Sequence, residues 1–380
     1  MINSIRVKNM NGEQKRAAKK GGNAKAVRPV LIASESTIFD YPMFLERLLV
    51  GLVAESIPVA LVCPPNCGVE SIISPSIEII QHPVIDLPFM WHYNRKILGG
   101  KLKKFKPTVL HCLCESKALL VRKMSHFLGL PYVLTVNSLQ NRYFNFFISS
   151  SRCVKITVPA ESIAANLAGI SSRLAKRIVR VNMGAFVGEG RGHFCDASLP
   201  VNVMIAHRLD DADDFEKVFG ALRHLAIDGR EFMLVIAGDG EEESEVRKLL
   251  GALGLSDMVT IVPLLRPWSS VLGIGDIFIR VAPNTAFDPL LLEAMSLGLA
   301  VAGCKGGVDD LIIEGQTAVT FDPDDELSIY NSLKRLFGRR ELARKIAKGA
   351  QAYLRTNHTV SNMVSSTLRT YHEAVQWYKG

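Results

Sequence analysis

The sequence contains no long apolar segment and few aromatic side chains. No uninterrupted apolar run reaches the ~18 residues of a membrane-spanning helix, so a transmembrane protein is not expected, although a peripheral one is compatible with this. Of the 380 residues, 7% are aromatic, 22% charged and 48% hydrophobic. This composition excludes wholesale disorder, collagen and coiled coils. A chain of this length usually forms more than one domain, and we expect two.

The seven cysteines form no CxxC pair, and no apolar export signal is present near the start. An odd cysteine count without metal-ligand spacing predicts reduced thiols in the cytosol. Cys112 and Cys114 lie near the end of an expected strand, and we interpret both as small buried hydrophobic residues. The expected localisation is cytoplasmic, with a peripheral position on the inner face of the membrane as the alternative.

Acidic residues are scarce in the first half of the chain. Residues 1–28 hold eight basic residues against one acidic residue, residues 29–199 hold 18 against 11, and residues 200–380 hold 19 against 25. Because the folded part is nearly neutral, we do not expect nucleic-acid binding. We interpret residues 1–28 as a disordered, solvated tail. The second interpretation is that the tail and the basic half of the chain, 29–199, are attracted to an anionic membrane surface. Each basic residue near the surface contributes ~1 kcal/mol of binding free energy.

Short apolar runs rich in valine and isoleucine alternate with segments of helical periodicity in both halves of the chain. This alternation predicts parallel strands joined by helical crossovers. The expected strands are 30–33, 59–62, 77–80, 108–111, 132–136 and 155–158, followed by 201–206, 232–237, 259–262, 277–281, 300–302 and 318–321.

Periodicity is lost in 184–200, which is rich in glycine and is therefore the expected linker. We predict an α/β fold with two Rossmann-like, doubly wound domains, 29–190 and 200–358. Ligands of such folds bind at the carboxyl ends of the strands, so we expect the site in a central crevice between the domains. We expect a last helix within 359–380 to pack back toward the first domain.

Two glycines follow the expected strand 300–302. A helix is expected from Val308 to Ile313, and Gly306 and Gly307 at its start would expose backbone N–H groups to an anion, with Lys305 placed to assist. From the local sequence alone, a plain turn explains this segment equally well.

A single arginine, Arg208, follows the strand 201–206. Arginine at the carboxyl end of a parallel strand faces the crevice, and its planar fork suits a phosphate. The alternative is an ion pair with the acidic run that begins at Asp210. That run includes Asp211 and Asp213 in a DxD pattern, which we interpret as a solvated loop and helix start rather than a metal site.

Three further polar residues stand beside expected strands or in apolar surroundings. Glu293 lies in an apolar helix start, where a carboxylate can accept hydrogen bonds from a ribose diol or pair locally. His111 ends one strand and Asn137 follows the next, so both are expected to face the crevice. A lone histidine is more often structural than catalytic.

The segment from Phe287 to Ala302, together with Gly306 and Gly307, resembles the retaining GT-B glycosyltransferases of family 4, also called group 1. The resemblance is strong over about 200–355 and weaker over 29–199. It implies that a nucleotide sugar, here a UDP- or GDP-sugar, binds the C-terminal domain. It also implies that a glycan or lipid-linked acceptor binds the N-terminal domain. The family needs no metal ion or other cofactor.

The resemblance assigns roles to particular residues. Glu293 matches a ribose-binding glutamate and Arg208 a diphosphate-binding arginine, while His111 and Asn137 would line the sugar pocket. The resulting catalytic candidates are His111, Asn137 and Arg208. The donor-binding candidates are Arg208, Lys305, Thr285, Phe287, Glu293, Gly306 and Gly307.

The sequence departs from the family pattern in four places, the first being that the glycine pair of the first turn is missing from 34–44. Thr285 replaces the first of two paired glutamates, Asp213 replaces a lysine, and Asn137 replaces a histidine. Lys305 or Lys217 could supply the missing positive charge. Two functions follow: a hexosyltransferase, or an inactive GT-B protein that serves as a scaffold or partner of an active enzyme.

Overall fold

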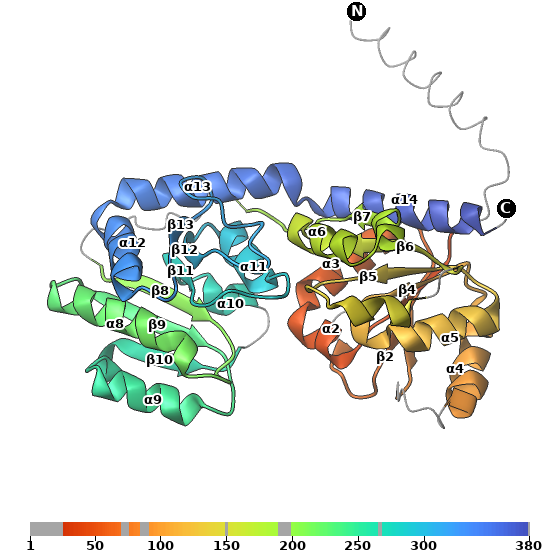
Figure 1. Ribbon diagram of the computed structural model, residues 1–380, viewed down its shortest axis with the longest axis horizontal. Helices are drawn as coiled ribbons and strands as arrows, with labels where there is room; N and C mark the ends of the chain where they lie inside the picture. Colours follow the sequence, from red (N-terminus) through yellow and green to blue (C-terminus); the bar gives the residue numbers. More distant parts are fainter. Residues whose placement is uncertain are drawn as a thin grey trace, which may run out of the picture.

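The computed structural model describes residues 26–69, 76–83, 91–148, 151–188, 199–264 and 268–378. Most of the predicted tail, Cys195 and the centre of the predicted linker lie outside the described residues. Two α/β domains lie side by side (Figure 1), and each is built around a parallel sheet. The prediction of an α/β fold with two Rossmann-like domains is confirmed.

The N-terminal domain contains a seven-stranded parallel sheet in the order β3-β2-β1-β4-β5-β6-β7. Most of its strands are buried on both faces, which explains why they were recognisable as continuous apolar runs. The strands are β1 Pro29–Ile32, β2 Val59–Cys63, β3 Ile77–Gln81, β4 Val109–Cys112, β5 Tyr132–Thr135, β6 Cys153–Val158 and β7 Ile178–Arg180. The α-helices are α2 Glu35–Asp40, α3 Pro42–Ala54, α4 Trp91–Phe105, α5 Ala118–Leu128, α6 Glu161–Ile170 and α7 Ser172–Ala175, with 3-10 turns at Glu115–Lys117 and Arg142–Phe147.

The C-terminal domain contains a six-stranded parallel sheet in the order β10-β9-β8-β11-β12-β13. The strands are β8 Val201–Ala206, β9 Phe232–Ala237, β10 Val259–Val262, β11 Ile277–Arg280, β12 Ala300–Cys304 and β13 Val319–Phe321. The helices are α8 Asp213–Ile227, α9 Glu243–Ala252, α10 Trp268–Leu272, α11 Pro289–Leu297, α12 Glu326–Gly338 and α13 Arg340–Asn357, with a 3-10 turn at Ser256–Met258.

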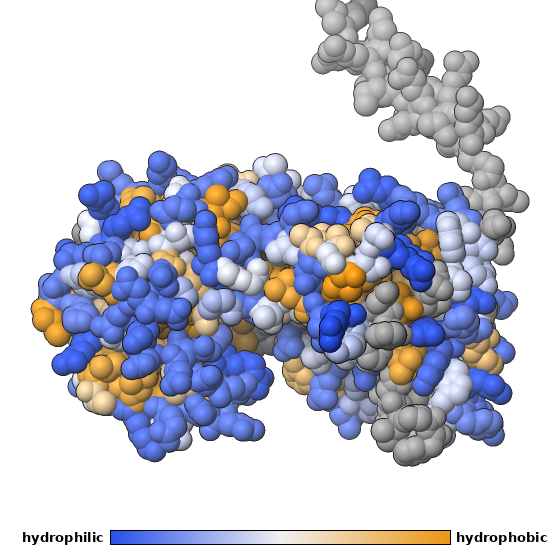
Figure 2. Space-filling view, in the orientation of Figure 1, coloured by the Kyte–Doolittle hydropathy of each residue, from blue (hydrophilic) through white to orange (hydrophobic). Residues whose placement is uncertain are grey.

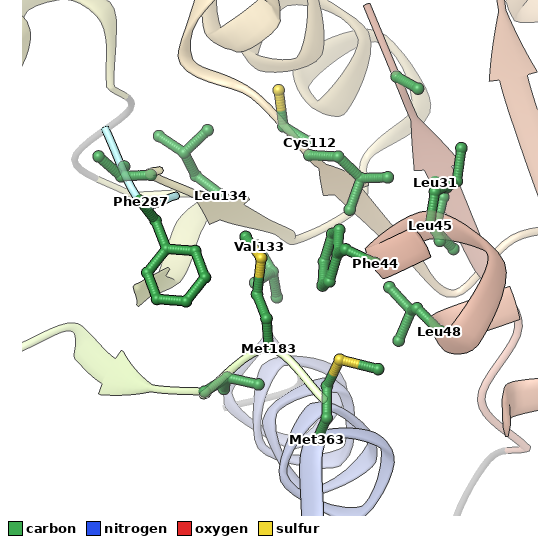
Figure 3. Close-up of a cluster of buried hydrophobic side chains, with 14 of the residues drawn as sticks. Leu31, Phe44, Leu45, Leu48, Cys112, Val133, Leu134, Met183, Phe287 and Met363 are labelled. Atoms are coloured by element: carbon green, nitrogen blue, oxygen red, sulfur yellow. The ribbon is translucent and has the colours of Figure 1, made fainter. Parts of the chain in front are cut away.

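The last helix, α14 (Val360–Trp377), lies on the N-terminal domain against α3 and strands β4 to β6. In Figure 1, α13 and α14 run along the same side of the molecule, one over each domain. Figure 3 shows Met363 of α14 near Leu48 of α3 and Val133 of β5. The chain therefore returns to its first domain after completing the second.

The predicted helix from Val308 to Ile313 is absent, and this segment forms turns instead. The Thr317 hydroxyl donates to the Leu311 carbonyl oxygen (2.6 Å) and accepts from the Ile313 N–H (2.8 Å). A side chain that bonds nearby backbone in this way offers an alternative to helical hydrogen bonds. The short strand β7 was not predicted.

The surface is mainly hydrophilic on the face drawn in Figure 2, with apolar side chains in small scattered groups. No helix in the described part of the chain is long and apolar enough to cross a membrane. The six cysteines among the described residues are buried and none of them forms a disulfide.

Candidate active site

The candidate site lies where the carboxyl edges of the two sheets meet. The loop after β5 pairs with the loop after β11 as a short antiparallel bridge. The Leu139 N–H donates to the Thr285 carbonyl oxygen, and the Phe287 N–H donates to the Asn137 carbonyl oxygen, each at 2.8 Å. Figure 2 shows a notch between the domains on the side away from α13 and α14. Loops from both domains therefore border one crevice, as expected for ligand sites in this fold class.

Glu293, expected to bind a ribose, is bonded to the other domain. Arg47 of α3 donates from Nη2 to Glu293 Oε2 at 2.8 Å and from Nη1 to the Gly184 carbonyl oxygen at 3.1 Å. Both side chains are buried, with 5% of Arg47 and 7% of Glu293 exposed. A ribose diol that bonds Oε2 of this carboxylate would therefore have to compete with the guanidinium of Arg47.

Arg208 stands at the crevice but is paired within its own loop. Its side chain is 72% exposed, and it donates to both carboxylate oxygens of Asp210, at 2.5 and 3.2 Å. These hydrogen bonds raise the pKa of Arg208. The ion pair considered as the alternative is thus formed, and a diphosphate would have to displace Asp210.

The first turn of α8 is acidic. Asp213 is the first residue of this helix, and Asp214 accepts from His207 Nε2 at 3.0 Å. Lys217, one turn further along, forms a long ion pair with Glu216 at 3.9 Å. Asp213, at the position where a lysine was expected, therefore places a negative charge near the carboxyl end of β8.

The glycine loop after β12 lies against the loop after β11. Gly306 has φ +117° and Gly307 φ +64°, and a Cβ at Gly307 would overlap the carbonyl oxygen of Asn284. The Gly306 N–H donates to Asp309 Oδ2 at 2.9 Å, so this amide is already used. Lys305 is exposed beside them. Both glycines are required by the backbone geometry, as expected where chains approach closely.

Asn137 lies at the junction next to a buried carboxylate, Glu115. Glu115 Oε1 accepts from the Asn137 N–H at 2.6 Å and from the Ser138 N–H at 3.1 Å. Burial raises the pKa of Glu115. Asn137 Nδ2 donates to the Leu113 carbonyl oxygen at 3.3 Å, while its Oδ1 is buried and has no partner among the described residues.

His111 does not face the crevice, contrary to expectation. Its ring is 2% exposed and lies beneath α14, with Nδ1 2.6 Å from the Tyr371 hydroxyl and Nε2 2.7 Å from the Thr135 hydroxyl. Burial lowers its pKa to about 3. Because both nitrogens are bonded inside the N-terminal core, His111 supports the packing of α14 rather than a sugar pocket.

Phe287, a donor-binding candidate, is also buried. Its ring is 2% exposed and stacks on His358 with centroids 6.4 Å apart, and the Tyr41 hydroxyl donates to its carbonyl oxygen at 3.2 Å. Figure 3 shows it in the apolar cluster where the domains join. Phe287 therefore connects the domains, whereas the exposed side chain of Thr285, two residues earlier, is open to the crevice.

A further arginine, Arg280, ends β11 and is 5% exposed. Its Nη2 is 3.5 Å from the Gly306 carbonyl oxygen, and its Nε and Nη1 have no hydrogen-bond partner among the described residues. The side chain thus lies at the centre of the sheet edge that borders the crevice.

Sequence reasoning missed Arg47, Glu115 and Arg280. Arg47 and Glu293 are 246 positions apart, so no spacing could reveal their contact. Arg280 did carry a signal, because it is a charged residue at the end of an otherwise apolar strand. In the described part of the chain, no group of three or more His, Cys, Asp or Glu side chains could hold a metal ion.

Comparison with known proteins finds a family model that matches the second domain. Residues 200–353 match the family model "Glycosyl transferases group 1". The chain is 26% identical over 174 residues to alpha-D-kanosaminyltransferase of Streptomyces kanamyceticus, covering 45% of each chain. It is 30% identical over 125 residues to the sulfoquinovosyl transferase SQD2 of Arabidopsis thaliana, covering 32% of this chain and 24% of SQD2. The matched segments thus span less than half of these relatives.

Solved structures match over both domains. A glycosyltransferase from Rickettsia africae superimposes with a TM-score of 0.76 at 16% identity, covering 93% of this chain and 99% of that one. Anabaena HepE in complex with UDP and glucose gives 0.75 at 12% identity, covering 90% and 99%. Residues 200–353 are therefore similar to the glycosyl transferases group 1, and the two domains together have the GT-B fold.

Proposed function

We propose that the chain transfers a hexose from a UDP- or GDP-sugar to a glycan or lipid-linked acceptor. In the reaction, the bond between the anomeric carbon and the diphosphate oxygen breaks, and the acceptor hydroxyl oxygen takes its place with release of a proton. The anomeric configuration is retained, and neither a metal ion nor another cofactor takes part.

The match of residues 200–353 to the group 1 family carries this proposal. Two relatives are named for the transfer of a sugar, kanosamine in one and sulfoquinovose in the other. A structural neighbour, HepE, holds UDP and glucose. Because the fold alone does not determine chemistry, the proposal depends on the residues at the carboxyl edges of the sheets.

The role of the donor-side residues follows from charge. Negative charge develops on the diphosphate as it leaves, and preorganised positive groups stabilise it most in a site that excludes water. Arg208 and Lys305 stand at this edge of the sheet, and Glu293 is available to a ribose once Arg47 releases it. Asp213 would disfavour the leaving diphosphate, because it brings a negative charge to the same edge.

The test is thermal unfolding with UDP, GDP, ADP and their sugars, followed by a transfer assay with the donor that binds. A ligand at ~100 times its dissociation constant stabilises the folded state by ~2.7 kcal/mol. We expect nucleotides of one base to raise the melting temperature of the parent. Arg208→Ala and Glu293→Ala should each reduce this rise, which is measured relative to the same variant without ligand. No shift with any nucleotide would reject the donor site.

The second candidate function is an inactive scaffold or partner of an active glycosyltransferase. Its support is specific: Asp210 already pairs with Arg208, Arg47 already pairs with Glu293, and Asp213 replaces a lysine. A nucleotide that binds without any sugar transfer or donor hydrolysis would favour this function over the first.

We also propose that the basic face of the N-terminal domain contacts anionic lipid. Helices α4 and α5 bring cations over aromatic rings, with Lys103 Nζ 4.6 Å from the Phe127 ring centroid and Lys123 Nζ 5.6 Å from that of Trp91. Such pairs suit a membrane surface. The full chain should sediment with anionic vesicles but not with zwitterionic ones, and Lys103→Glu with Lys123→Glu should abolish this. Equal sedimentation with both vesicle types would contradict it.

A further inference from the structure

Arg280 is a buried arginine for which the described residues supply no anion. It ends β11, between β8 and β12 in the C-terminal sheet. Its Nε and Nη1 are covered and have no hydrogen-bond partner in the described part of the chain. The remaining contact, from Nη2 to the Gly306 carbonyl oxygen, is long at 3.5 Å.

The neighbouring carboxylate, Asp288, interacts with Arg280 electrostatically but makes no hydrogen bond with it. Its Oδ1 accepts from the Leu290 N–H at 3.0 Å and from the Leu291 N–H at 2.9 Å, and so caps the start of α11. Burial raises the pKa of Asp288 and the positive charge of Arg280 opposes that shift, so the two groups are near one another.

An unpaired buried charge is costly, and a guanidinium cannot relieve the cost by losing its proton. A buried arginine of this kind therefore needs an anion from elsewhere. The glycine loop at Gly306 and Gly307 beside Arg280 suits one, because it allows close approach of backbone. The planar fork of arginine fits a phosphate with two parallel hydrogen bonds.

We infer that Arg280 binds the diphosphate of the donor and is the main positive group that this chain uses for it. This rests on the proposed function, and it deepens that function by naming a cation at a different position from Arg208. Arg208 is already held by Asp210, whereas Arg280 has no competing carboxylate. Because the nitrogens of Arg280 are covered, the side chain has to give up its long contact with the Gly306 carbonyl oxygen to reach the anion.

The experiment compares thermal unfolding of the parent protein, Arg280→Met and Arg280→Lys, each without ligand and with uridine, UDP or inorganic pyrophosphate. Without ligand, Arg280→Met should melt at or above the temperature of the parent, because a buried unpaired charge is removed. UDP and pyrophosphate should raise the melting temperature of the parent, and this rise should be lost in Arg280→Met. Arg280→Lys should bind UDP at least about tenfold more weakly by calorimetry.

Arg47→Met is the matched control, because it removes a buried arginine that does have a partner. It should melt well below the parent. A similar drop in the melting temperature of Arg280→Met would show a structural role and overturn the inference. The inference would also be overturned if UDP raised the melting temperature of both Arg280 variants as much as that of the parent. If pyrophosphate but no nucleotide stabilises the parent through Arg280, the anion site stands while the proposed function fails. If neither ligand stabilises the parent, both fail.

Discussion

His111 and His358 show how single buried side chains fix the packing of the C-terminal part of the chain on the N-terminal domain. Both rings are buried, and burial lowers their pKa values to about 3 and about 4. His111 bonds Tyr371 and Thr135, while His358 donates from Nδ1 to the Met183 carbonyl oxygen at 3.0 Å. Each ring stays neutral in the folded protein at a pH where the unfolded chain binds a proton.

Stability should therefore fall as the pH is lowered. An unfolded histidine takes up a proton below its ordinary pKa of 6.5, whereas the folded forms do so only near 3 and 4. Between these values the unfolded state binds more protons, so the free energy of unfolding decreases by up to about 1 kcal/mol per pH unit for each histidine. Urea unfolding from neutral pH to about pH 4.5 measures this slope.

The matched variants are His111→Gln and His372→Gln, the second at an exposed position of α14. His111→Gln should unfold more easily at neutral pH but show a flatter pH dependence, because it removes one buried titrating group. His372→Gln should keep the slope of the parent. A parent-like slope in His111→Gln would contradict this explanation.

At the scale of elements, the loop after β12 is held in place by its neighbours. The Gly306 amide bonds Asp309, and the Val308 N–H donates to the Asn284 carbonyl oxygen at 2.7 Å. The loop after β11 and the loop after β12 thus form one unit at the edge of the crevice, with Arg280 beneath it.

Gly307→Ala should destabilise this unit. Gly307 has φ +64°, and a Cβ would overlap the Asn284 carbonyl oxygen, so the substitution combines backbone strain with a steric clash. Gly254→Ala is the control, because Gly254 has φ +70° but nothing within 4 Å of the added atom. We expect a loss of about 1 kcal/mol for the control and more than about 2 kcal/mol for Gly307→Ala in urea unfolding. Equal losses would show that the close approach does not matter.

At the scale of the molecule, the domains are joined by a buried ion pair and by backbone hydrogen bonds between their loops. Arg47 and Glu293 contribute the ion pair, and the loops after β5 and β11 contribute the hydrogen bonds. The donor binding proposed for Glu293 would therefore use the same carboxylate as the contact between the domains.

A double-mutant cycle on this pair should be strongly non-additive. Arg47→Met or Glu293→Met alone removes one partner and should cost about 3–5 kcal/mol of stability, whereas the two substitutions together should cost less than the sum. Denaturant unfolding of the four proteins measures the coupling. Additive losses would mean that the ion pair does not hold the domains together.

The positions of strands could be predicted from the sequence where most residues of the strand are buried. Strands such as β8 and β12 are apolar and buried, so their positions and the α/β class could be predicted. The direction in which the His111 side chain points could not be predicted. A strand that is covered on both faces is apolar throughout, so its sequence has no periodicity that distinguishes one face from the other. The segment after Gly307 resembled a helix, but Thr317 bonds its backbone in turns. Contacts such as Arg47 with Glu293 join residues far apart in sequence, and only the folded chain brings them together.

The return of α14 to the first domain has a consequence for how the protein is made. The face of the N-terminal sheet over β4 to β6 is covered by residues 360–377, which are synthesised after both sheets. Until they emerge from the ribosome, His111 lacks Tyr371 and the apolar face at Val133 lacks Met363. The domain that is translated first is therefore the one that is completed last.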